Sequence, residues 1–214
     1  MRKIWSYLTI PAAALAVLTG SIAWVLLLRP FYYVQIGPLG VCDASGLTAA
    51  QVRAAYGDVM AYGLGLRPDF AAGVQPFSAE GASHFADVRG LFILDLAVLA
   101  AALLFLLGLW IVCRRRRTAL PRLGGRAPGF WAACGLGGVI LIVAALAATD
   151  FDRAFTIFHG IFFPGKENWL FDPATDPVIL LLPEEFFRNC AIAIAVSLLG
   201  LCLVLVLTGR KQKK

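Results

Sequence analysis

Two histidines, His84 and His159, are the side chains of this sequence best suited to transfer a proton. An unperturbed histidine has a pKa of about 6.5, so near neutral pH it can take up a proton and give it back. Asp87 follows His84 by three positions and shares its helical face. Asp152 precedes His159 by seven positions and lies on the same helical face. This spacing favours acid–base catalysis, with Asp87 or Asp152 orienting an imidazole ring.

A structural role and a metal-binding role both stay open for the histidine pair. Both histidines could form structural hydrogen bonds only, or they could bind a metal ion together with an aspartate. No Cys-x-x-Cys pair and no zinc-ligand spacing occurs, so we expect no metal and no cofactor. A Gly-x-Ser-x-Gly motif is also absent, and nothing indicates an activated thiol at Cys42. We therefore expect acid–base chemistry without a covalent intermediate.

Four long apolar runs must position these residues. The chain has 214 residues, of which 60% are hydrophobic and 15% charged, whereas soluble domains carry about 25% charged residues. The runs cover about 8–28, 91–113, 130–148 and 190–207, each close to the roughly 20 residues that cross a bilayer. The sequence thus predicts an all-α integral membrane protein, a single membrane domain over 1–214 with four transmembrane helices.

Basic residues predict the orientation of these spans. The segments 1–7, 114–129 and 208–214 fall on one side and contain no Asp or Glu. Their basic residues are Arg2, Lys3, Arg114, Arg115, Arg116, Arg117, Arg122, Arg126, Arg210, Lys211, Lys213 and Lys214, which is 12 of 19. Since Lys and Arg are retained in cytoplasmic segments, both termini are predicted to be cytoplasmic. The same arrangement explains the net charge of +6 without nucleic acid, which we do not expect as a partner.

The first outer loop, about 29–90, contains signals for short interfacial helices. Phe31-Tyr32-Tyr33 is an aromatic group typical of the membrane interface. Thr48 and Gln51 form a capping-box pattern at the start of a helix with one apolar face. Ser83 is predicted to cap the second span, which places His84 in its first turn. The apolar face consists of Val52, Tyr56 and Val59.

The second outer loop, about 149–189, begins with Thr149-Asp150-Phe-Asp152, another helix start. A stripe of phenylalanines follows at helical spacing and is expected to bury itself in lipid or protein. The run from Val178 to Leu182 is too short to cross a bilayer, so we expect a re-entrant or interfacial turn. The stripe consists of Phe151, Phe155, Phe158 and Phe162.

These motifs occur in an order seen in one known family. They are Phe31-Tyr32-Tyr33, Ser-His84-Phe-Ala-Asp87-Val-Arg89, Phe158-His159-Gly-Ile-Phe-Phe163, Trp169, Asp172-Pro, and Leu-Leu-Pro183-Glu-Glu-Phe-Phe187. The chain resembles the lipoprotein intramolecular transacylases of Gram-positive bacteria over nearly its whole length. The two histidine motifs are the most specific part of the resemblance. One departure is Pro177 after Asp176, where the family pattern has an apolar residue.

The resemblance implies a reaction and a set of site residues. Members of this family move the sn-2 acyl chain of a diacylglyceryl-cysteine onto its α-amine, which gives an N-acyl lyso-lipoprotein. The implied catalytic residues are His84 and His159, and the matching supporting residues are Asp87, Arg89, Trp169 and Asp172, to which helical spacing adds Asp152. The partners are then diacylglyceryl lipoproteins and membrane lipid, and the site lies on the outer face of a bacterial cell membrane.

Functions of two different classes fit the same sequence. The outer loops could bind a protein partner, in which case the chain is a non-enzymatic scaffold or assembly factor. It could also be another outer-leaflet lipid acyltransferase or a hydrolase. The oligomeric state and a possible disulfide between Cys42 and Cys190 stay open, because nothing in the spacing demands that bond.

Overall fold

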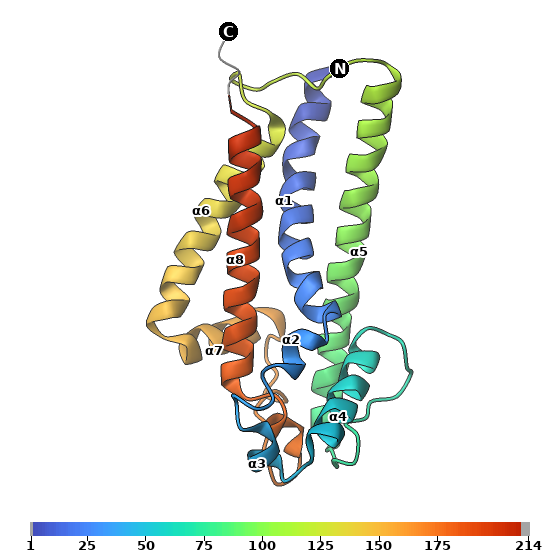
Figure 1. The fold of residues 1–214 in the computed structure, drawn as a ribbon, viewed down its shortest axis with the longest axis vertical. Helices are drawn as coiled ribbons and strands as arrows, with labels where there is room; N and C mark the ends of the chain where they lie inside the picture. Colours follow the sequence, from blue (N-terminus) through green and yellow to red (C-terminus); the bar gives the residue numbers. More distant parts are fainter. Residues whose placement is uncertain (1, 211–214) are drawn as a thin grey trace. The chain divides into compact units, whose positions relative to one another are not determined.

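The computed structural model describes residues 2–210 and contains helices but no strand within that range. Four of its helices are long and apolar enough to cross a membrane (Figure 1): α1 (Arg2–Leu27), α5 (Ala79–Arg115), α6 (Pro128–Thr149) and α8 (Glu184–Thr208). Each coincides with one predicted run to within a residue or extends beyond it. The predicted all-α fold with four spans is therefore confirmed.

The chain divides into two compact units. Unit 1 comprises residues 2–23, 95–149 and 193–210 of the described range, and unit 2 comprises 24–94 and 150–192. The division falls inside α1, α5 and α8. Helix α5 has 37 residues and is about 55 Å long, well beyond the roughly 30 Å of a bilayer core. Residues 79–90 of α5 precede the apolar run, so we treat them as lying outside the span.

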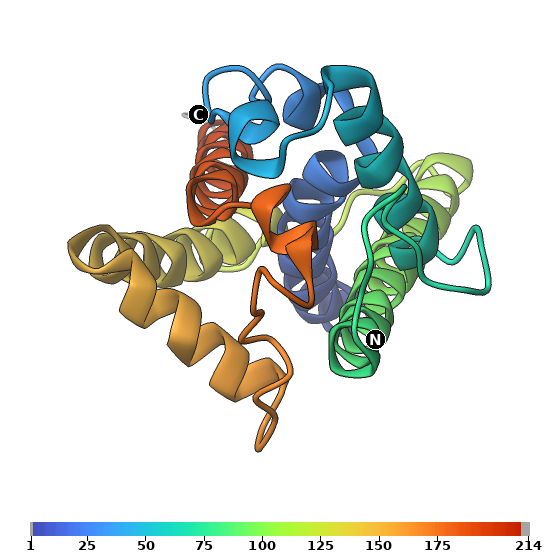
Figure 2. The same cartoon turned by 90° about the horizontal axis from the view of Figure 1, so that it is seen from below.

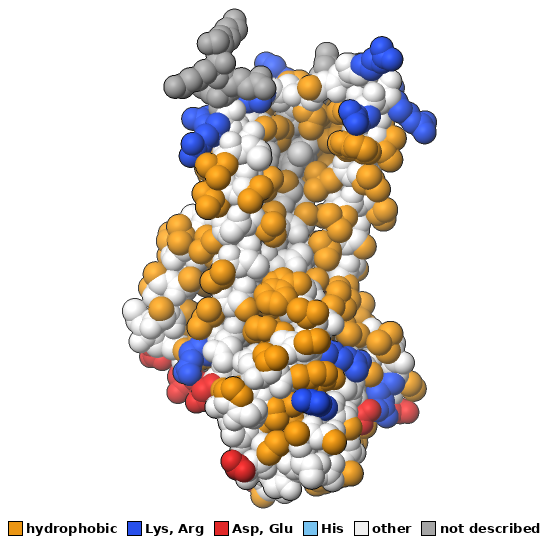
Figure 3. Space-filling model, in the orientation of Figure 1, with side chains coloured by type: hydrophobic (Ala, Val, Ile, Leu, Met, Phe, Trp, Pro, Cys, Tyr) orange, Lys and Arg blue, Asp and Glu red, His pale blue; other side chains and the backbone are white. Residues whose placement is uncertain are grey.

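Unit 1 contains the apolar helices and one end rich in arginine. Its small core is formed by Ala133, Leu198 and Cys202. At one end, Arg122 donates a hydrogen bond to the Arg210 carbonyl at 2.9 Å. Figure 3 shows Lys and Arg side chains gathered at this end of the long helices and hydrophobic side chains along them. The predicted basic residues Lys211, Lys213 and Lys214 lie outside the described residues.

Unit 2 contains the short helices of the two predicted outer loops. They are α2 (Pro30–Tyr33), α3 (Val41–Ser45), α4 (Ala49–Gly63), α7 (Phe151–Phe162) and the 3-10 helix η1 (Pro177–Leu180). The predicted capping box starts α4: Thr48 Oγ1 accepts from the Gln51 amide, and the Gln51 side chain accepts from the Thr48 amide. The predicted apolar face of α4 is buried in the unit's core.

The core of unit 2 corrects the expectation for Tyr32 and defines the segment around Val178. The sequence predicts Tyr32 at the membrane interface, but Tyr32 is fully buried, stacked on Tyr56 at 3.8 Å, and donates to the Leu181 carbonyl at 2.6 Å. The segment expected as a re-entrant or interfacial turn forms η1, whose Val178 is 1% exposed. In Figure 2, η1 lies between α7 and α4. Both aromatic and apolar signals are therefore used for packing inside this unit.

The start of α5 differs from the prediction, whereas the start of α7 agrees with it. Ser78, not Ser83, accepts the Gly81 amide at 2.9 Å, and α5 begins at Ala79. Ser83 lies inside the helix, because the earlier serine already satisfies a free amide of the first turn. Helix α7 begins where expected, with Asp150 accepting the Arg153 amide at 3.0 Å. His84 is therefore held in a regular turn rather than in a fraying first turn.

Candidate active site

The two histidines lie next to each other inside unit 2. His84 comes from α5 and His159 from the last turn of α7, and their ring centroids are 5.7 Å apart. Both side chains are buried, with 6% and 5% of their surface exposed. Residues far apart in the sequence thus form one buried pair of imidazoles, which is the arrangement that concerted proton transfer needs.

His159 is enclosed by aromatic rings and fixed by a backbone carbonyl. Its Nδ1 lies 2.8 Å from the Phe155 carbonyl oxygen. Because a carbonyl can only accept, Nδ1 carries the hydrogen and Nε2 keeps its lone pair. Trp169 stacks on the imidazole at 4.3 Å. Burial lowers the pKa of His159, and the bond to Phe155 opposes that shift only in part. In this arrangement the Nε2 lone pair of His159 is not engaged by the Phe155 carbonyl.

His84 lies among aromatic rings as well, but polar groups act on it. Burial, and then His159, lower its pKa to about 4, while Asp87 and Asn168 oppose that shift. Its Nδ1 is buried and has no hydrogen-bond partner among residues 2–210. The Phe163 ring lies 5.0 Å away. A buried imidazole nitrogen without a partner is costly, so it marks a position where a substrate atom can bind.

Polar side chains from the segment after α7 bind Asp87, three residues after His84. Lys166 donates to both oxygens of Asp87, at 2.6 and 2.7 Å, and Asn168 donates to Asp87 Oδ2 at 3.3 Å. The Lys166 bond lowers the pKa of Asp87, so this carboxylate stays charged. Reasoning from the sequence misses both Lys166 and Asn168. One signal is available there, because Lys166 is the only lysine between Lys3 and Lys211.

Of the predicted supporting residues, Asp87 and Trp169 join the histidines. Trp169 stacks on His159 and donates through Nε1 to the Lys166 carbonyl at 3.1 Å. Asp172 instead shapes the turn that follows, where its Oδ1 accepts the Ala174 amide at 2.9 Å.

The remaining two predicted supporting residues make contacts elsewhere in unit 2. Arg89 lies over the Tyr62 ring at 5.0 Å and donates to two carbonyls of the loop after α4. Asp152 is exposed; burial, and then the carboxylate of Asp152, raise the pKa of Glu184. Arg89 therefore makes a packing contact, and the pKa of His159 depends on burial and the Phe155 carbonyl rather than on Asp152.

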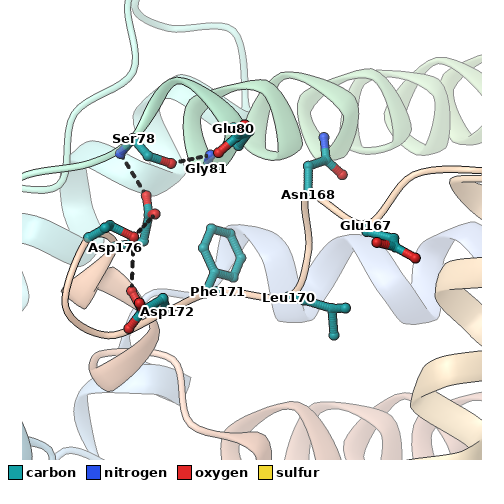
Figure 4. Close-up of a pocket in the computed structure, with 10 residues that line it drawn as sticks. Ser78, Glu80, Gly81, Glu167, Asn168, Leu170, Phe171, Asp172 and Asp176 are labelled. Atoms are coloured by element: carbon teal, nitrogen blue, oxygen red, sulfur yellow. Dashed lines mark hydrogen bonds between the residues drawn. The ribbon is translucent and has the colours of Figure 1, made fainter.

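A pocket of about 380 Å³ borders this site (Figure 4). Asn168 and Phe171 line it, and the Phe171 ring also lies 5.5 Å from His84. Asp176 forms its opposite wall, is buried, and accepts the Ser78 amide at 2.8 Å. A side chain at Gly81 would overlap Asp176 Oδ1, so glycine is required there. Pro177 after Asp176 is accommodated as the first residue of η1.

The sequence leaves both a metal site and a disulfide open. In the part of the chain that the structure describes, no three His, Cys, Asp or Glu side chains are grouped to hold a metal ion. Cys42 and Cys190 are free thiols that pack against the core of unit 2.

Comparison with known proteins identifies the family. A family model described as lipoprotein intramolecular transacylase Lit matches residues 7–187. The chain belongs to this family. It is therefore an acyltransferase that carries out intramolecular transacylation of lipoproteins, and its four apolar helices make it a multi-pass membrane protein. Among curated proteins, none matches the sequence significantly.

Solved structures of the Lit family share the fold. The membrane-integral lipoprotein intramolecular transacylase Lit from Bacillus cereus matches with a TM-score of 0.83 at 23% identity, covering 97% of this chain and 94% of that one. A variant of the same protein with a histidine-to-arginine mutation has a TM-score of 0.78 at 21% identity, covering 97% and 90%. A histidine-to-alanine variant has a TM-score of 0.78 at 22% identity, covering 97% and 93%. The likeness extends over nearly the whole chain.

Proposed function

We propose that the chain moves the sn-2 acyl chain of a diacylglyceryl-cysteine to its α-amine by acid–base catalysis with His84 and His159. The observation that carries this proposal is the buried pair of imidazoles, with ring centroids 5.7 Å apart, in which His159 Nδ1 binds a carbonyl and His84 Nδ1 has no partner. Donor and acceptor are parts of one lipopeptide, so the amine is already present at a high effective concentration. The enzyme has to fold the lipid, move one proton and stabilise one oxyanion.

In the first step, the amine nitrogen attacks the ester carbonyl carbon and Nε2 of His159 takes the amine proton. The free lone pair on Nε2 fits this role, because Nδ1 is engaged by the Phe155 carbonyl. The carbonyl oxygen becomes an oxyanion, and His84 donates Nδ1–H to it. Both histidines are neutral at pH 7, since burial lowers the pKa of each.

In the second step, the bond between the acyl carbon and the glycerol oxygen breaks. His159 gives its proton to that oxygen, so the products are an amide and a free sn-2 hydroxyl, and the enzyme returns to its starting state. No water enters this balance, and the phenylalanines around the pair exclude it. Asp87, held by Lys166, is a positioning residue that keeps His84 oriented.

The remaining predicted residues belong to the same proposal. Trp169 fixes the ring of His159 by stacking. Arg89, Asp152 and Asp172 hold the helices and turns around the pair. We place both termini in the cytoplasm and the histidines on the extracytoplasmic face of the cell membrane. The arginines at one end of unit 1 support this orientation, because Lys and Arg are retained on the cytoplasmic side.

Mass spectrometry of a lipoprotein's N-terminal lipopeptide tests this function. A host that makes only diacylglyceryl lipoproteins would express the wild type, His84→Ala, His159→Ala, or the control Thr156→Ala, whose side chain is exposed on α7. Transacylation conserves mass, so fragment ions must locate the acyl chain on the amine or on the glycerol. We expect N-acylation by the wild type and the control only. If either histidine variant still produces it at the wild-type rate, histidine catalysis is rejected, and release of free fatty acid would indicate a hydrolase.

A further inference from the structure

A groove in unit 1, lined by none of the residues of the histidine site, is not used by the proposed transacylation. It has a volume of about 780 Å³ and lies between α1 and the final turns of α5. Its lining includes Trp5, Leu104, Phe105, Gly108, Val112 and Arg116, together with the segment 118–121. The volume is in the range of sites that hold small molecules.

The walls of this groove are apolar and open. Trp5 and Phe105 contact each other with ring centroids 6.4 Å apart. Leu104, Val112 and Trp5 are 69%, 46% and 46% exposed. These residues lie in helices that span the membrane, where lipid hydrocarbon chains surround the protein. Apolar walls can contact such a chain without a desolvation penalty.

One end of the groove carries a positive charge without an acidic partner. Arg116 lines it, and no ion pair of the described residues involves Arg116. The sequence contains no Asp or Glu between Asp95 and Asp150, so nothing near in the chain neutralises this guanidinium. Helix α5 ends at this point, where Arg117 adopts a left-handed φ of 51° and turns the chain into the segment that closes the groove.

We propose that this groove binds an anionic phospholipid, with one acyl chain along α5 and the phosphate at Arg116. An apolar groove that ends in an unpaired guanidinium is complementary to a lipid tail that ends in a phosphate. With the predicted orientation, the lipid belongs to the cytoplasmic leaflet, whose anionic lipids attract basic segments. The site is independent of the proposed histidine chemistry.

The first test compares headgroups by native mass spectrometry of the detergent-solubilised protein. Phosphatidylglycerol and phosphatidylcholine with identical chains are added at equal concentration. We expect the wild type to retain phosphatidylglycerol preferentially and Arg116→Gln to weaken that binding about fivefold. Arg114→Gln is the matched control, because the Arg114 side chain lies over the Trp110 ring and does not line the groove. Equal retention of both lipids by the wild type overturns the proposal.

The second test fills the apolar part. A Cβ atom added at Gly108 meets no atom within 4 Å, so the backbone has room for a side chain there, and Gly108→Leu adds apolar volume to the groove that Gly108 lines. Gly138→Leu is the control, since Gly138 has equally open space on α6 and does not line the groove. Only Gly108→Leu is expected to reduce phosphatidylglycerol retention. Unchanged retention overturns the proposal, and so does a change in oligomer mass without loss of lipid, which would indicate a second copy in the groove.

Discussion

His84 and His159 have similar burial but different surroundings. Around His159 the nearest groups are aromatic rings, and the single hydrogen bond of its imidazole goes to a backbone carbonyl. Around His84 there are aromatic rings too, but Asp87 and Asn168 act on the imidazole and Lys166 holds Asp87 in place. One histidine is therefore fixed by packing and backbone, and the other is supported by charge.

This difference is the basis for the two roles proposed for the histidines. An uncharged imidazole with a free Nε2 is suited to accept a proton, because the carbonyl bound at Nδ1 keeps the lone pair on Nε2. A neutral imidazole whose buried Nδ1 has no partner is suited to donate an N–H to an oxyanion, and the neighbouring carboxylate of Asp87 can help to orient it. The two histidines should therefore respond differently when each is replaced by a residue that can donate but cannot act as a base.

Glutamine is that residue, and it should produce the largest contrast. His159→Gln removes the base and is expected to lower the transacylation rate by about 10²–10⁴-fold. His84→Gln keeps an N–H donor and should lose only about tenfold, whereas His84→Ala should lose about 10²–10³-fold. Initial rates from the lipopeptide fragment-ion assay measure all three. Equal losses in the two glutamine variants would contradict the separate roles.

The pH dependence sharpens the contrast between the two rings further. Since the pKa of His84 is lowered to about 4 and that of His159 lies below its usual value, both imidazoles stay neutral through pH 7 and only protonate at lower pH. The substrate α-amine, with a pKa of about 8, is then the group that protonates first. As the pH falls from 7 to 6.5, we expect the logarithm of the rate to fall with a slope of one against pH, which corresponds to about tenfold per pH unit. A slope near two in that window would show that a histidine titrates together with the amine.

Removing the charge beside His84 should have a smaller effect than removing a histidine. Asp87→Asn loses the carboxylate that Lys166 holds and that favours positive charge on His84, so we expect about a tenfold slower rate with little change in KM. Asp58→Asn is the control, because Asp58 forms a comparable ion pair with Arg67 at 2.7 Å elsewhere in unit 2. The measurements are kcat and KM in mixed micelles. If both variants slow the reaction equally, Asp87 has only a structural role.

The parts of the fold that the sequence predicts well are those determined by neighbouring residues. The four spans, the capping box at Thr48 and the start of α7 at Asp150 each follow from a local pattern, and the structure contains all of them. Ser83 is a residue type that caps helices and is predicted to cap α5. Ser78 is of the same type, and it is the serine that caps the helix in the structure. Where two residues satisfy the same local rule, the tertiary contact decides, and here Asp176 binds the Ser78 amide.

The site is predictable in its chemistry but not in its contacts. Histidine has a pKa that singles it out from the sequence alone, so both members of the pair can be named. The ion-pair partner of Asp87 is Lys166, which is 79 residues away in the sequence, and no periodicity connects the two. Asp152 shows the converse, since helical spacing places it on the face of His159 while its carboxylate acts on the pKa of Glu184. Spacing thus predicts which residues share a helix, but not which helix faces them.

A substitution far from both rings tests whether the surroundings of His84 depend on the turn at Asp176. Gly81→Ala places a methyl group against Asp176 Oδ1, so the carboxylate must move and its bond to the Ser78 amide weakens. We expect a loss of about 1–3 kcal/mol in the free energy of unfolding and a drop of a few degrees in Tm.

The matched control is Gly90→Ala on the same helix, where an added methyl meets no atom within 4 Å and should stabilise the helix by about 1 kcal/mol. Thermal unfolding in detergent separates the two. The segment that carries Lys166 and Asn168 ends at this turn, so Gly81→Ala should also slow the reaction a few fold while the stacking of Trp169 on His159 is retained. That stacking is measured as the part of the tryptophan fluorescence that Trp169→Phe removes, because the chain contains four other tryptophans. If the Trp169 signal changes as much as the rate, the contacts around His84 and those around His159 move together, and the proposal that each histidine is held separately is wrong.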